Sequence, residues 1–513
     1  MNQRFLHSLA EKKIVQWFHS TIGVIICLLL QPLAAQEGGE TSSDTEDTPV
    51  VIEEIAGDVG LTGQRPWRPP DFSNQEQHLG YRPDLFSVPQ SLQKNFQFWL
   101  DIYTKYTTDQ GVLHDSENLN FIYQALDFSP VVRRTDLNLF QKERERRRLV
   151  KYAKQSIEDL LLKLHHTKNP DSLNSEERRV WDAFRSDSNP RKFLEARKKN
   201  RLRFQLGQRD RMILGIFFSG RYLEEFERIF RETQLPLELT RLVFVESSFN
   251  VLARSKVGAS GLWQIMRATG RPHLMMTDSI DKRNHPIEAT KMAARFLKNN
   301  FVMLEDWPLA ITGYNHGPSG VQRLTRLHRT RDLGEIANNF DAKKRLGFAS
   351  RNFYASFLAA LEAERRADFY FGVVRWSQAL AATDIKLAFP ISYRDILRWF
   401  DGDDQKAQIF NPHITSSARK FDRPLPRGAL ISVPQAKSDQ ILAELEELRR
   451  KPSAPQKRTA SSIVAPSQTY LVQIGDSFWS IAREFGISHR ELMRANPHLS
   501  PEQIKPGESL QIP

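Results

Sequence analysis

Apolar positions dominate one stretch near the middle of the chain, residues 237–250, which reads LELTRLVFVESSFN. Its apolar residues surround the axis of a helix instead of forming one stripe, and a helix that is apolar all round is buried. Pro236, just before it, suits the first turn of a helix, where a missing N–H costs nothing. The pattern therefore predicts a buried helix that carries a carboxylate, Glu246, near its C-terminal end.

The position of Glu246 predicts unusual titration. Burial and the negative end of the helix dipole both disfavour the ionised form, so we expect its pKa to be raised. A carboxyl group that stays protonated near neutral pH can act as the general acid in glycosidic cleavage. The alternative is a glutamate that pairs with a neighbouring arginine or faces solvent. On this stretch alone the alternative is favoured, so the rest of the chain must decide.

Helical periodicity covers much of the chain around this stretch. An apolar stripe that includes Trp99 and Tyr103 opens it, and between Lys142 and Arg231 the same periodicity carries many charged residues. Because acidic residues are mixed with the basic ones, we interpret the charged run as a solvated helix face. The pattern predicts an N-terminal helical region over residues 88–234 and a helical domain over residues 235–372.

Strand-like alternation appears only late, near residues 430–433 and 470–473. An internal echo accompanies it: Asn411-Pro412-His413-Ile414 recurs as Asn496-Pro497-His498-Leu499. Both copies then end with a Gly, two alternating apolar residues and a Pro. The echo predicts two related small modules, at residues 385–434 and 468–513, with a charged helix and a Pro/Ser/Ala-rich linker between them at residues 435–467.

The N-terminus has the order of a secretory signal. Basic residues precede the apolar run 21–30, and the small pair Ala34-Ala35 follows it. The run is shorter than the roughly 20 residues of a membrane-spanning helix. We therefore predict a signal peptide over residues 1–35, with an uncleaved anchor as the alternative. Residues 36–87 are acidic and lack apolar periodicity, which predicts a disordered spacer.

Composition narrows the class of protein. A chain of 513 residues with 40% hydrophobic residues forms several domains. Its net charge of +12 indicates an anionic partner, and the absence of zinc-finger and RNP motifs disfavours nucleic acid. The one cysteine, Cys27, lies inside the predicted signal, so the mature chain has no disulfide, cysteine nucleophile or Cys-ligated metal. His316 has no neighbouring ligand residue, so we expect neither metal nor cofactor.

Two further motifs follow Glu246-Ser247. Residues 258–265, GASGLWQI, combine small residues with an aromatic and an amide, and residues 314–317, YNHG, end an apolar helix. Each alone is compatible with a packed turn or a helix end. Together and in this order they resemble the catalytic domain of the lytic transglycosylases, glycoside hydrolase family 23, which has a goose-lysozyme-like fold. Residues 98–107 and 347–354 resemble the membrane-bound D type of that family.

The C-terminal module resembles LysM, a small βααβ glycan-binding fold. The resemblance rests on Tyr470-Leu471-Val472, on the stretch 475–482 (GDSFWSIA) and on Asn496-Pro497. The earlier copy lacks this GDSFW opening, so we interpret it as a degenerate LysM-like module. By the resemblance, the glycan-binding residues of the second module are Gly475, Asp476, Ser477, Asn496 and Pro497.

The resemblance implies a mainly α-helical, lysozyme-like enzyme that cleaves the β-1,4 bond between N-acetylmuramic acid and N-acetylglucosamine in peptidoglycan. Cleavage would proceed without water and leave a 1,6-anhydromuramoyl end. Glycosidases ordinarily use two carboxylates, and here we find one well-placed candidate, Glu246. The nearest others, Asp278 and Asp281, are better explained as helix caps. One carboxylate suffices if the substrate's own hydroxyl is the nucleophile.

The family pattern also implies the supporting residues. Tyr314 would orient Glu246 by a hydrogen bond, and Ser247 is expected to be structural because a serine at a helix end often bonds its own backbone. The expected substrate-binding residues are Ser255, Gln264, Ile265, Tyr314, Asn315 and Gly317. The expected partner is the peptidoglycan glycan strand, in the periplasm or cell envelope of a Gram-negative bacterium, with membrane association open. Two alternatives remain: a hydrolytic muramidase and a non-catalytic wall-binding scaffold.

Overall fold

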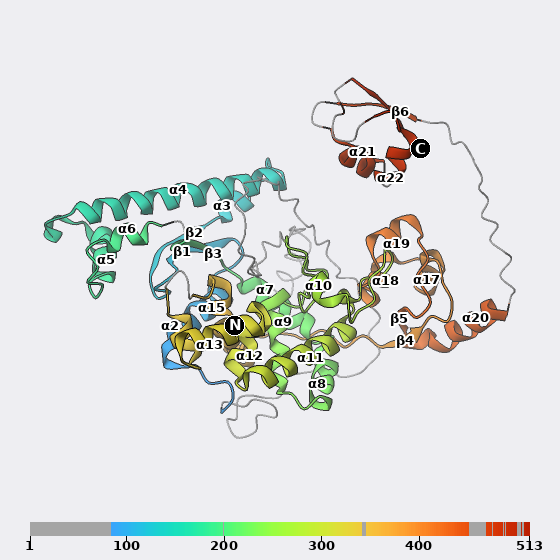
Figure 1. Ribbon diagram of the computed structural model, residues 1–513, viewed down its shortest axis with the longest axis horizontal. Coiled ribbons are helices and arrows are strands. Elements are labelled where there is room, and N and C mark those ends of the chain that lie inside the picture. The colour runs from blue at the N-terminus through green and yellow to red at the C-terminus, as the bar shows by residue number, and fades with distance from the viewer. Residues whose placement is uncertain are drawn as a thin grey trace, which may run out of the picture. The chain divides into compact units, whose positions relative to one another are not determined.

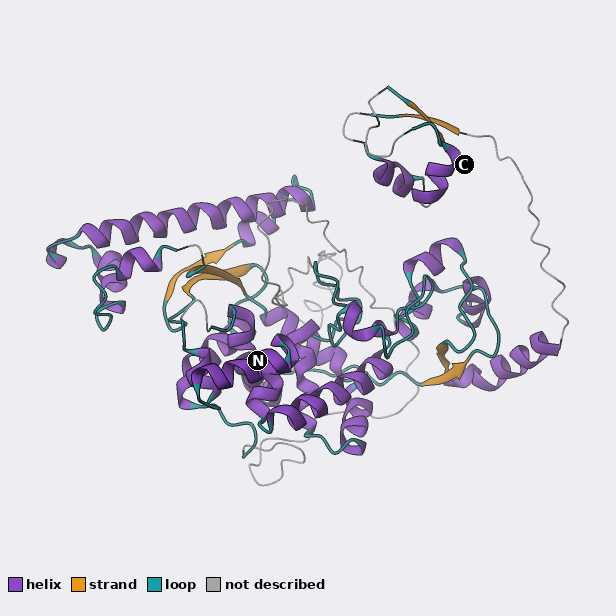
Figure 2. Cartoon of the chain, in the orientation of Figure 1, coloured by secondary structure: helices purple, strands orange, loops and turns teal. Residues whose placement is uncertain are grey.

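The computed structural model describes residues 84–198, 200–340 and 345–450, and in the C-terminal part residues 468–473, 476–485, 487, 489–499, 504 and 507–512. The predicted signal peptide and nearly all of the predicted spacer lie outside the described residues. The chain forms two compact units, of which the first ends at Leu442 and the second begins at Ala443. Helices predominate and the strands are short (Figures 1 and 2), so the prediction of a mainly α-helical protein is confirmed.

One hydrophobic core organises most of the first unit. Helix α2 packs along α15, and Asn95 on α2 donates a hydrogen bond of 2.8 Å to Asn352 on α15. This core therefore extends across the predicted boundary at residues 234–235. Its helices are α2 (Gln93–Thr104), α7 (Arg209–Ser219), α8 (Leu223–Glu232), η3 (Leu237–Arg241), α9 (Leu242–Ser247), α11 (Pro286–Leu304), α12 (Trp307–His316), α13 (Pro318–His328) and α15 (Phe348–Arg365).

The predicted helix over residues 237–250 is in fact two shorter elements. The 3₁₀-helix η3 leads into α9, and Ser248 and Phe249 then adopt left-handed φ angles of 49° and 57°. Pro236 precedes the first turn instead of lying within it. The hydroxyl of Thr240 donates to the carbonyl of Leu237 at 2.7 Å, a local bond that favours a tight turn over a continuous α-helix. The length prediction was wrong, and the burial prediction was right for most of the stretch.

A three-stranded antiparallel sheet interrupts the region that the periodicity predicts as purely helical. It comprises β1 (Gln110–Asp115), β2 (Ile122–Asp127) and β3 (Leu202–Leu206) in the order β2-β1-β3. Helix α4 (Leu139–His166) runs along it (Figure 1), and the two share a second core with Leu161 and Leu202. The polar residues His114 and Asp115 are fully buried in β1, which removes the alternation that marks a strand. The helix-only prediction was therefore wrong here.

The module at residues 385–434 is part of the first compact unit. Strand β4 (Ala382–Lys386) pairs antiparallel with β5 (Leu430–Pro434) around three helices: α17 (Tyr393–Trp399), α18 (Asp404–Phe410) and α19 (Ser416–Phe421). The module docks on the loop that precedes α11. Asp281 donates its backbone N–H to the carbonyl of His413 at 2.8 Å, and the rings of His285 and His413 lie 4.6 Å apart.

The second unit contains the predicted βααβ order. It comprises β6 (Gln468–Leu471), α21 (Phe478–Glu484), α22 (His489–Ala495) and β7 (Ser509–Ile512), with β6 and β7 antiparallel. The predicted charged helix is α20 (Ser438–Arg450). The shorter elements are η1 (Gln90–Leu92), α3 (Ser129–Val132), η2 (Pro170–Ser172), α5 (Ser175–Ala183), α6 (Lys192–Ala196), α10 (Arg267–Gly270), η4 (Lys282–Asn284), α14 (Leu333–Ala337), α16 (Ala367–Phe371) and η5 (Gln435–Lys437).

The asparagine of the repeated Asn-Pro-His has the same structural role in both modules. The amide of Asn411 donates to the carbonyl of Ser432 at 2.8 Å and accepts its N–H at 2.8 Å. Asn496 forms the same pair of bonds with Gln511, at 2.7 Å each. A side-chain amide here takes the place of a strand's peptide group. We call this feature the asparagine bridge.

No helix in the described ranges is long and apolar enough to cross a membrane.

Candidate active site

Glu246 lies in the last turn of α9, and its side chain is half-buried. Within the described part of the chain its carboxyl group receives no hydrogen bond and no salt bridge. Burial raises the pKa of Glu246 to about 8. The alternative of a glutamate paired with arginine is therefore wrong, and the expected raised pKa is found with burial as its cause.

The turn after α9 ties Glu246 to the loop that contains the GLWQ motif. The hydroxyl of Ser247 donates to the carbonyl of Leu262 at 2.9 Å and to that of Val243, one turn back, at 3.3 Å. Ser247 therefore bonds the backbone of its own helix, as expected, and also connects that helix to the loop at Leu262. Gly261 is required at the far end of that contact. Its φ is 79°, and a Cβ there would lie 2.2 Å from the carbonyl oxygen of Arg283.

The loop from Ser255 to Ile265 is held by its own hydrogen bonds. The hydroxyl of Ser255 accepts the N–H of Ala259 at 2.8 Å, and the backbones of Ser260 and Ile265 pair in both directions at 3.2 Å. Ile265 is buried and its backbone N–H and C=O are both bonded to Ser260, so the structure shows a core residue here and no free polar group for a ligand. The loop therefore presents few polar side-chain atoms that are not already bonded.

Gln264 is the exception in this loop. It is buried and has a left-handed φ of 45°. Its amide nitrogen donates to the carbonyl groups of Ala253 and Gly261, at 3.1 Å and 2.8 Å. Its amide oxygen is buried without a partner among the described residues. A buried acceptor without a donor costs free energy, so Gln264 is suited to accept an N–H group from a ligand.

Tyr314 lies on α12, but its hydrogen bond differs from the expected one. The hydroxyl donates to the backbone carbonyl of Trp263 at 2.9 Å, so its proton is not directed to Glu246. The negative charge of Glu246 contributes, after burial, to raising the pKa of Tyr314, which places the two groups within electrostatic reach. The prediction of a Tyr314–Glu246 hydrogen bond was wrong, because the Tyr314 hydroxyl donates its hydrogen bond to the carbonyl of Trp263.

The residues that follow Tyr314 end the helix. Asn315 accepts a hydrogen bond of 2.7 Å from the hydroxyl of Ser350 on α15, which leaves its amide nitrogen as a donor. Gly317 caps α12 with a φ of 89°, and a Cβ there would meet nothing within 4 Å. A glycine is therefore favoured at position 317 because of the positive φ angle, and not because a neighbouring atom leaves no room for a side chain.

Tyr103, on α2, is a site residue that the sequence did not indicate. It is buried in the main core, and a hydrogen bond with the side chain of Ser356 lowers the pKa of its hydroxyl, although less than burial raises it. Burial raises its pKa, and the charge of Glu246 adds to that effect. Its position in an apolar stripe predicts a core residue, which it is. Its hydroxyl becomes noticeable only once α2 is placed beside the core that holds α9.

The segment around Glu246 matches a known family of domains. Residues 227–336 match the family model described as Transglycosylase SLT domain, and residues 470–513 match the model described as LysM domain. The chain carries an SLT domain and a LysM domain. All the motif residues from Glu246 to Gly317 fall within the SLT domain.

The relatives cover only part of the chain. It is homologous to the membrane-bound lytic murein transglycosylase D of Escherichia coli strain K12, with 27% identity over 292 residues, 55% of this chain and 61% of that protein. The chain thus spans about three fifths of that relative's length. A putative tributyltin chloride resistance protein of Alteromonas sp. strain M-1 is 34% identical over 91 residues, 17% of this chain and 44% of that protein. The 70 kDa soluble lytic transglycosylase of Escherichia coli aligns with 16% identity and a TM-score of 0.26, over 55% of this chain and 52% of that structure.

The spare carboxylates of the SLT domain have other roles. Asp281 is buried, forms a salt bridge of 2.7 Å with Arg283 and caps η4 instead of the helix that begins at Pro286, for which the cap was predicted. Asp278 is exposed and lies 3.3 Å from Arg423. The cap of α11 is His285 instead. Among the described residues no group of histidine, cysteine and acidic side chains could hold a metal ion.

Of the predicted glycan-binding residues of the LysM domain, three form hydrogen bonds within the domain and one is exposed. Asn496 is buried, and the asparagine bridge uses its amide, so its assignment to glycan binding was wrong. Asp476 accepts from the hydroxyl of Tyr470 and the N–H of Gln473, both at 2.8 Å, and Ser477 caps α21. Pro497 is exposed. Gly475 lies outside the described residues.

Proposed function

We propose that this protein is a peptidoglycan lytic transglycosylase, which cleaves the bond between N-acetylmuramic acid and N-acetylglucosamine without water. The observation that carries the proposal is Glu246: a half-buried carboxyl group in an SLT domain, with a pKa near 8 and no partner among the described residues. The name of the Escherichia coli relative, a lytic murein transglycosylase, supports the same activity.

The reaction needs one group that first gives and then takes a proton. Protonated Glu246 donates its proton to the glycosidic oxygen as the bond to the muramoyl C1 breaks. The resulting carboxylate takes the proton of the muramoyl 6-hydroxyl as that oxygen attacks C1. The products are a 1,6-anhydromuramoyl end and a free N-acetylglucosamine hydroxyl, and Glu246 is again protonated. A second carboxylate is not needed, which agrees with the engagement of Asp281 by Arg283.

The supporting residues hold the sugar and the reacting groups. We assign the unpaired amide oxygen of Gln264 to an acetamido N–H and the amide nitrogen of Asn315 to a substrate carbonyl. The hydroxyl of Ser255 keeps a proton to donate, because it accepts from Ala259. Tyr314 acts as a positioning residue, since its bond to the Trp263 carbonyl fixes the turn that carries Gln264.

Sacculus digestion with mass analysis of the products tests the proposal. Anhydro ends are lighter than reducing ends by one water, so a lytic transglycosylase and a hydrolytic muramidase give different masses. We expect anhydro ends. Reducing ends alone would assign hydrolysis, and no products at all would leave a wall-binding scaffold.

The pH profile of the activity follows from the pKa of Glu246. Because the first step uses the protonated carboxyl, we expect kcat/KM for a soluble glycan to be level below about pH 8 and to fall about tenfold per pH unit above it. Assays between about pH 5 and pH 10 will show this limb. A fall that begins near pH 4.5, the ordinary value for glutamate, would contradict the assignment of Glu246 as the acid.

Tyr103→Phe will lower kcat by about tenfold to a hundredfold without unfolding the protein. The buried hydroxyl lies within electrostatic reach of Glu246, and we propose that it donates to the carboxylate that forms as the proton leaves; one such donor contributes about this much or more. Its loss will also move the alkaline limb to higher pH, because the carboxylate form loses a donor.

The matched control is Tyr222→Phe, which makes the same change in the same core at a tyrosine whose pKa does not respond to Glu246. We expect its kcat and its pH limb to match the wild type. Equal losses in the two variants, with an unmoved limb in both, would reduce Tyr103 to a packing residue.

We infer further that the LysM domain binds the wall and that the protein works in the periplasm or cell envelope of a Gram-negative bacterium. The LysM match and the membrane-bound relative support this location. The net charge of +12 favours retention on anionic envelope polymers.

A further inference from the structure

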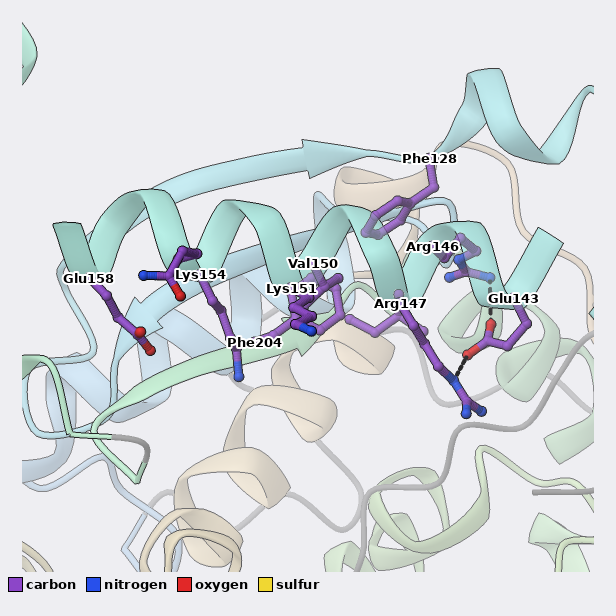
Figure 3. A pocket seen from close by; sticks show the side chains of 11 residues that line it. Phe128, Glu143, Arg146, Arg147, Val150, Lys151, Lys154, Glu158 and Phe204 are labelled. Carbon is purple, nitrogen blue, oxygen red and sulfur yellow. Dashed lines mark hydrogen bonds and ion pairs between the residues drawn. The ribbon is translucent and has the colours of Figure 1, made fainter. Parts of the chain in front are cut away.

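A groove of about 560 Å³ lies between helix α4 and strand β3 (Figure 3), outside the SLT match. Its floor is apolar and comes from Phe128 after β2, Val150 on α4, and Phe204 and Leu206 on β3. One face of α4 forms the other side, with residues spaced three and four apart over more than three turns. That face consists of Glu143, Arg146, Arg147, Val150, Lys151, Lys154, Gln155 and Glu158.

The charged rim of the groove is mainly basic. Four basic side chains line it against two acidic ones, a net charge of +2; Glu143 pairs with Arg147 at 3.1 Å and lies 3.9 Å from Arg146 (Figure 3). Arg146 lies over the ring of Phe128, at 5.1 Å from its centre, and donates to the carbonyl of Thr108 at 2.8 Å. Lys151 and Lys154 extend from α4 toward β3 (Figure 3). The rim therefore favours a negatively charged ligand.

The strand that borders the groove is an edge strand. Among the described strands β3 pairs only with β1. Two backbone hydrogen bonds show which residues of this segment direct their N–H and C=O groups to β1. The N–H of Ser116 donates to the carbonyl of Arg201 at 2.8 Å, and the N–H of Gly207 donates to the carbonyl of Gln110 at 2.9 Å. Because these bonds alternate along an antiparallel pair, Phe204 and Leu206 direct their backbone N–H and C=O groups away from β1. The side chain of Gln205 donates to the carbonyl of Leu206 at 3.0 Å.

We propose that this groove binds an extended, acidic peptide segment of a partner protein, which adds to β3 as a fourth strand. The outward N–H and C=O of Phe204 and the outward N–H of Leu206 supply the pairing, because the carbonyl of Leu206 already accepts from Gln205. The apolar floor takes alternate side chains of the peptide, and the basic rim takes the acidic ones. An edge strand with a hydrophobic floor is the geometry that strand addition uses. The site is separate from Glu246 and does not rest on the proposed catalytic activity.

Binding of a labelled peptide to the full-length protein tests the proposal. The probe is a fluorescein-labelled, capped peptide of four Glu-Val repeats, and the comparison peptide has four Lys-Val repeats. We expect fluorescence anisotropy to show saturable binding of the acidic peptide, weakened by salt. Binding of the basic peptide with equal affinity, or of neither peptide, would overturn the proposal.

Two pairs of variants locate the site. Leu206→Pro removes the outward N–H without removing a bond of the ladder to β1, and it should weaken binding about tenfold. Its control, Leu206→Val, keeps that N–H and should bind within about threefold of wild type. Lys151→Glu should also weaken binding about tenfold, whereas Arg144→Glu, on the same helix but outside the groove, should not.

The outcomes separate this site from the active site and from self-occupancy. All four variants should digest sacculi at the wild-type rate, which also shows that they fold. Equal binding by Leu206→Pro and Leu206→Val would overturn strand addition. If Glu53→Gln with Glu54→Gln, in the chain's own acidic stretch, strengthens peptide binding about tenfold, that stretch competes for the groove and the proposal of a partner protein fails.

Discussion

Glu246→Gln will lower the rate of anhydromuropeptide release about a thousandfold or more. The amide has the size of the carboxyl group but cannot donate a proton to the glycosidic oxygen or accept one from the 6-hydroxyl, and general acid–base catalysis contributes about this factor. Sacculus digestion followed by mass analysis measures the effect. Binding of sacculi by the variant should stay close to wild type, because the LysM domain is unchanged.

Asp278→Asn is the matched control for this substitution. It makes the same change at an exposed carboxylate of the SLT domain, and we expect full activity. If Asp278→Asn abolished cleavage as well, a mechanism with two carboxylates would replace the one proposed here. Full turnover by Glu246→Gln would refute the catalytic assignment outright.

The same variant should be more stable than the wild type near neutral pH. The folded-state pKa of Glu246, about 8, lies above the ordinary value of 4.5, so the folded protein binds a proton more tightly than the unfolded chain. The contribution of Glu246 to the free energy of unfolding of the wild type is thus fully present below about pH 4.5 and is lost as the pH rises toward 8. Glutamine does not titrate, so we expect a gain of about 1–3 kcal/mol in the free energy of unfolding at pH 7.

Arg241→Met will destabilise the protein by about 3–5 kcal/mol, the largest stability effect we expect. Arg241 is buried at the junction of η3 and α9, with Glu364 at 3.3 Å and Glu227 also bonded to its guanidinium group. Burial raises the pKa of Glu364, and Arg241 opposes that rise. Without the arginine, a carboxyl group remains in the core with no compensating charge. Urea denaturation followed by circular dichroism measures the loss.

An exposed ion network provides the control. Arg228→Met also removes a guanidinium group that binds two glutamates, Glu225 and Glu232, but on the surface of α8. Its cost should stay below about 1 kcal/mol, because exposed ion pairs contribute little. Arg241→Met combined with Glu364→Leu should recover at least half of the loss. A cost for Arg228→Met equal to that for Arg241→Met would show that burial is not the reason.

The chain's chemistry was predictable from local sequence, because each motif is a short run with a demanding conformation. Glu246 stood out as one carboxylate in an apolar stretch, and its raised pKa follows from that setting alone. The turn at Gly261 and the cap at Gly317 need left-handed backbone, which their glycines indicate. The second βααβ unit and its Asn-Pro-His echo were readable for the same reason.

What the sequence hid depends on partners far apart in the chain. Strand β1 was not predicted because two polar residues, His114 and Asp115, are buried in it and break the apolar alternation. Asp115 is paired with Arg201, which lies far away in the sequence. The predicted hydrogen-bond acceptor of Tyr314 was wrong, because a sequence motif does not show that the backbone carbonyl of Trp263 lies beside its hydroxyl. Tyr103 joined the site only through the packing of α2 on α15. Asn496 looked like a ligand residue because a motif does not separate a structural asparagine from a functional one.

The asparagine bridge has a consequence for ancestry. Asn411 and Asn496 each bond both backbone groups of one residue in the closing strand, and a side chain repeated in the same role points to duplication of one gene segment. The copies then diverged in opposite ways. The second copy belongs to the separate C-terminal unit, whereas the first packs on the loop before α11 through His413. The bridge is present even in the copy that lacks the GDSFW opening, which indicates a role in the fold of the module and not in sugar recognition.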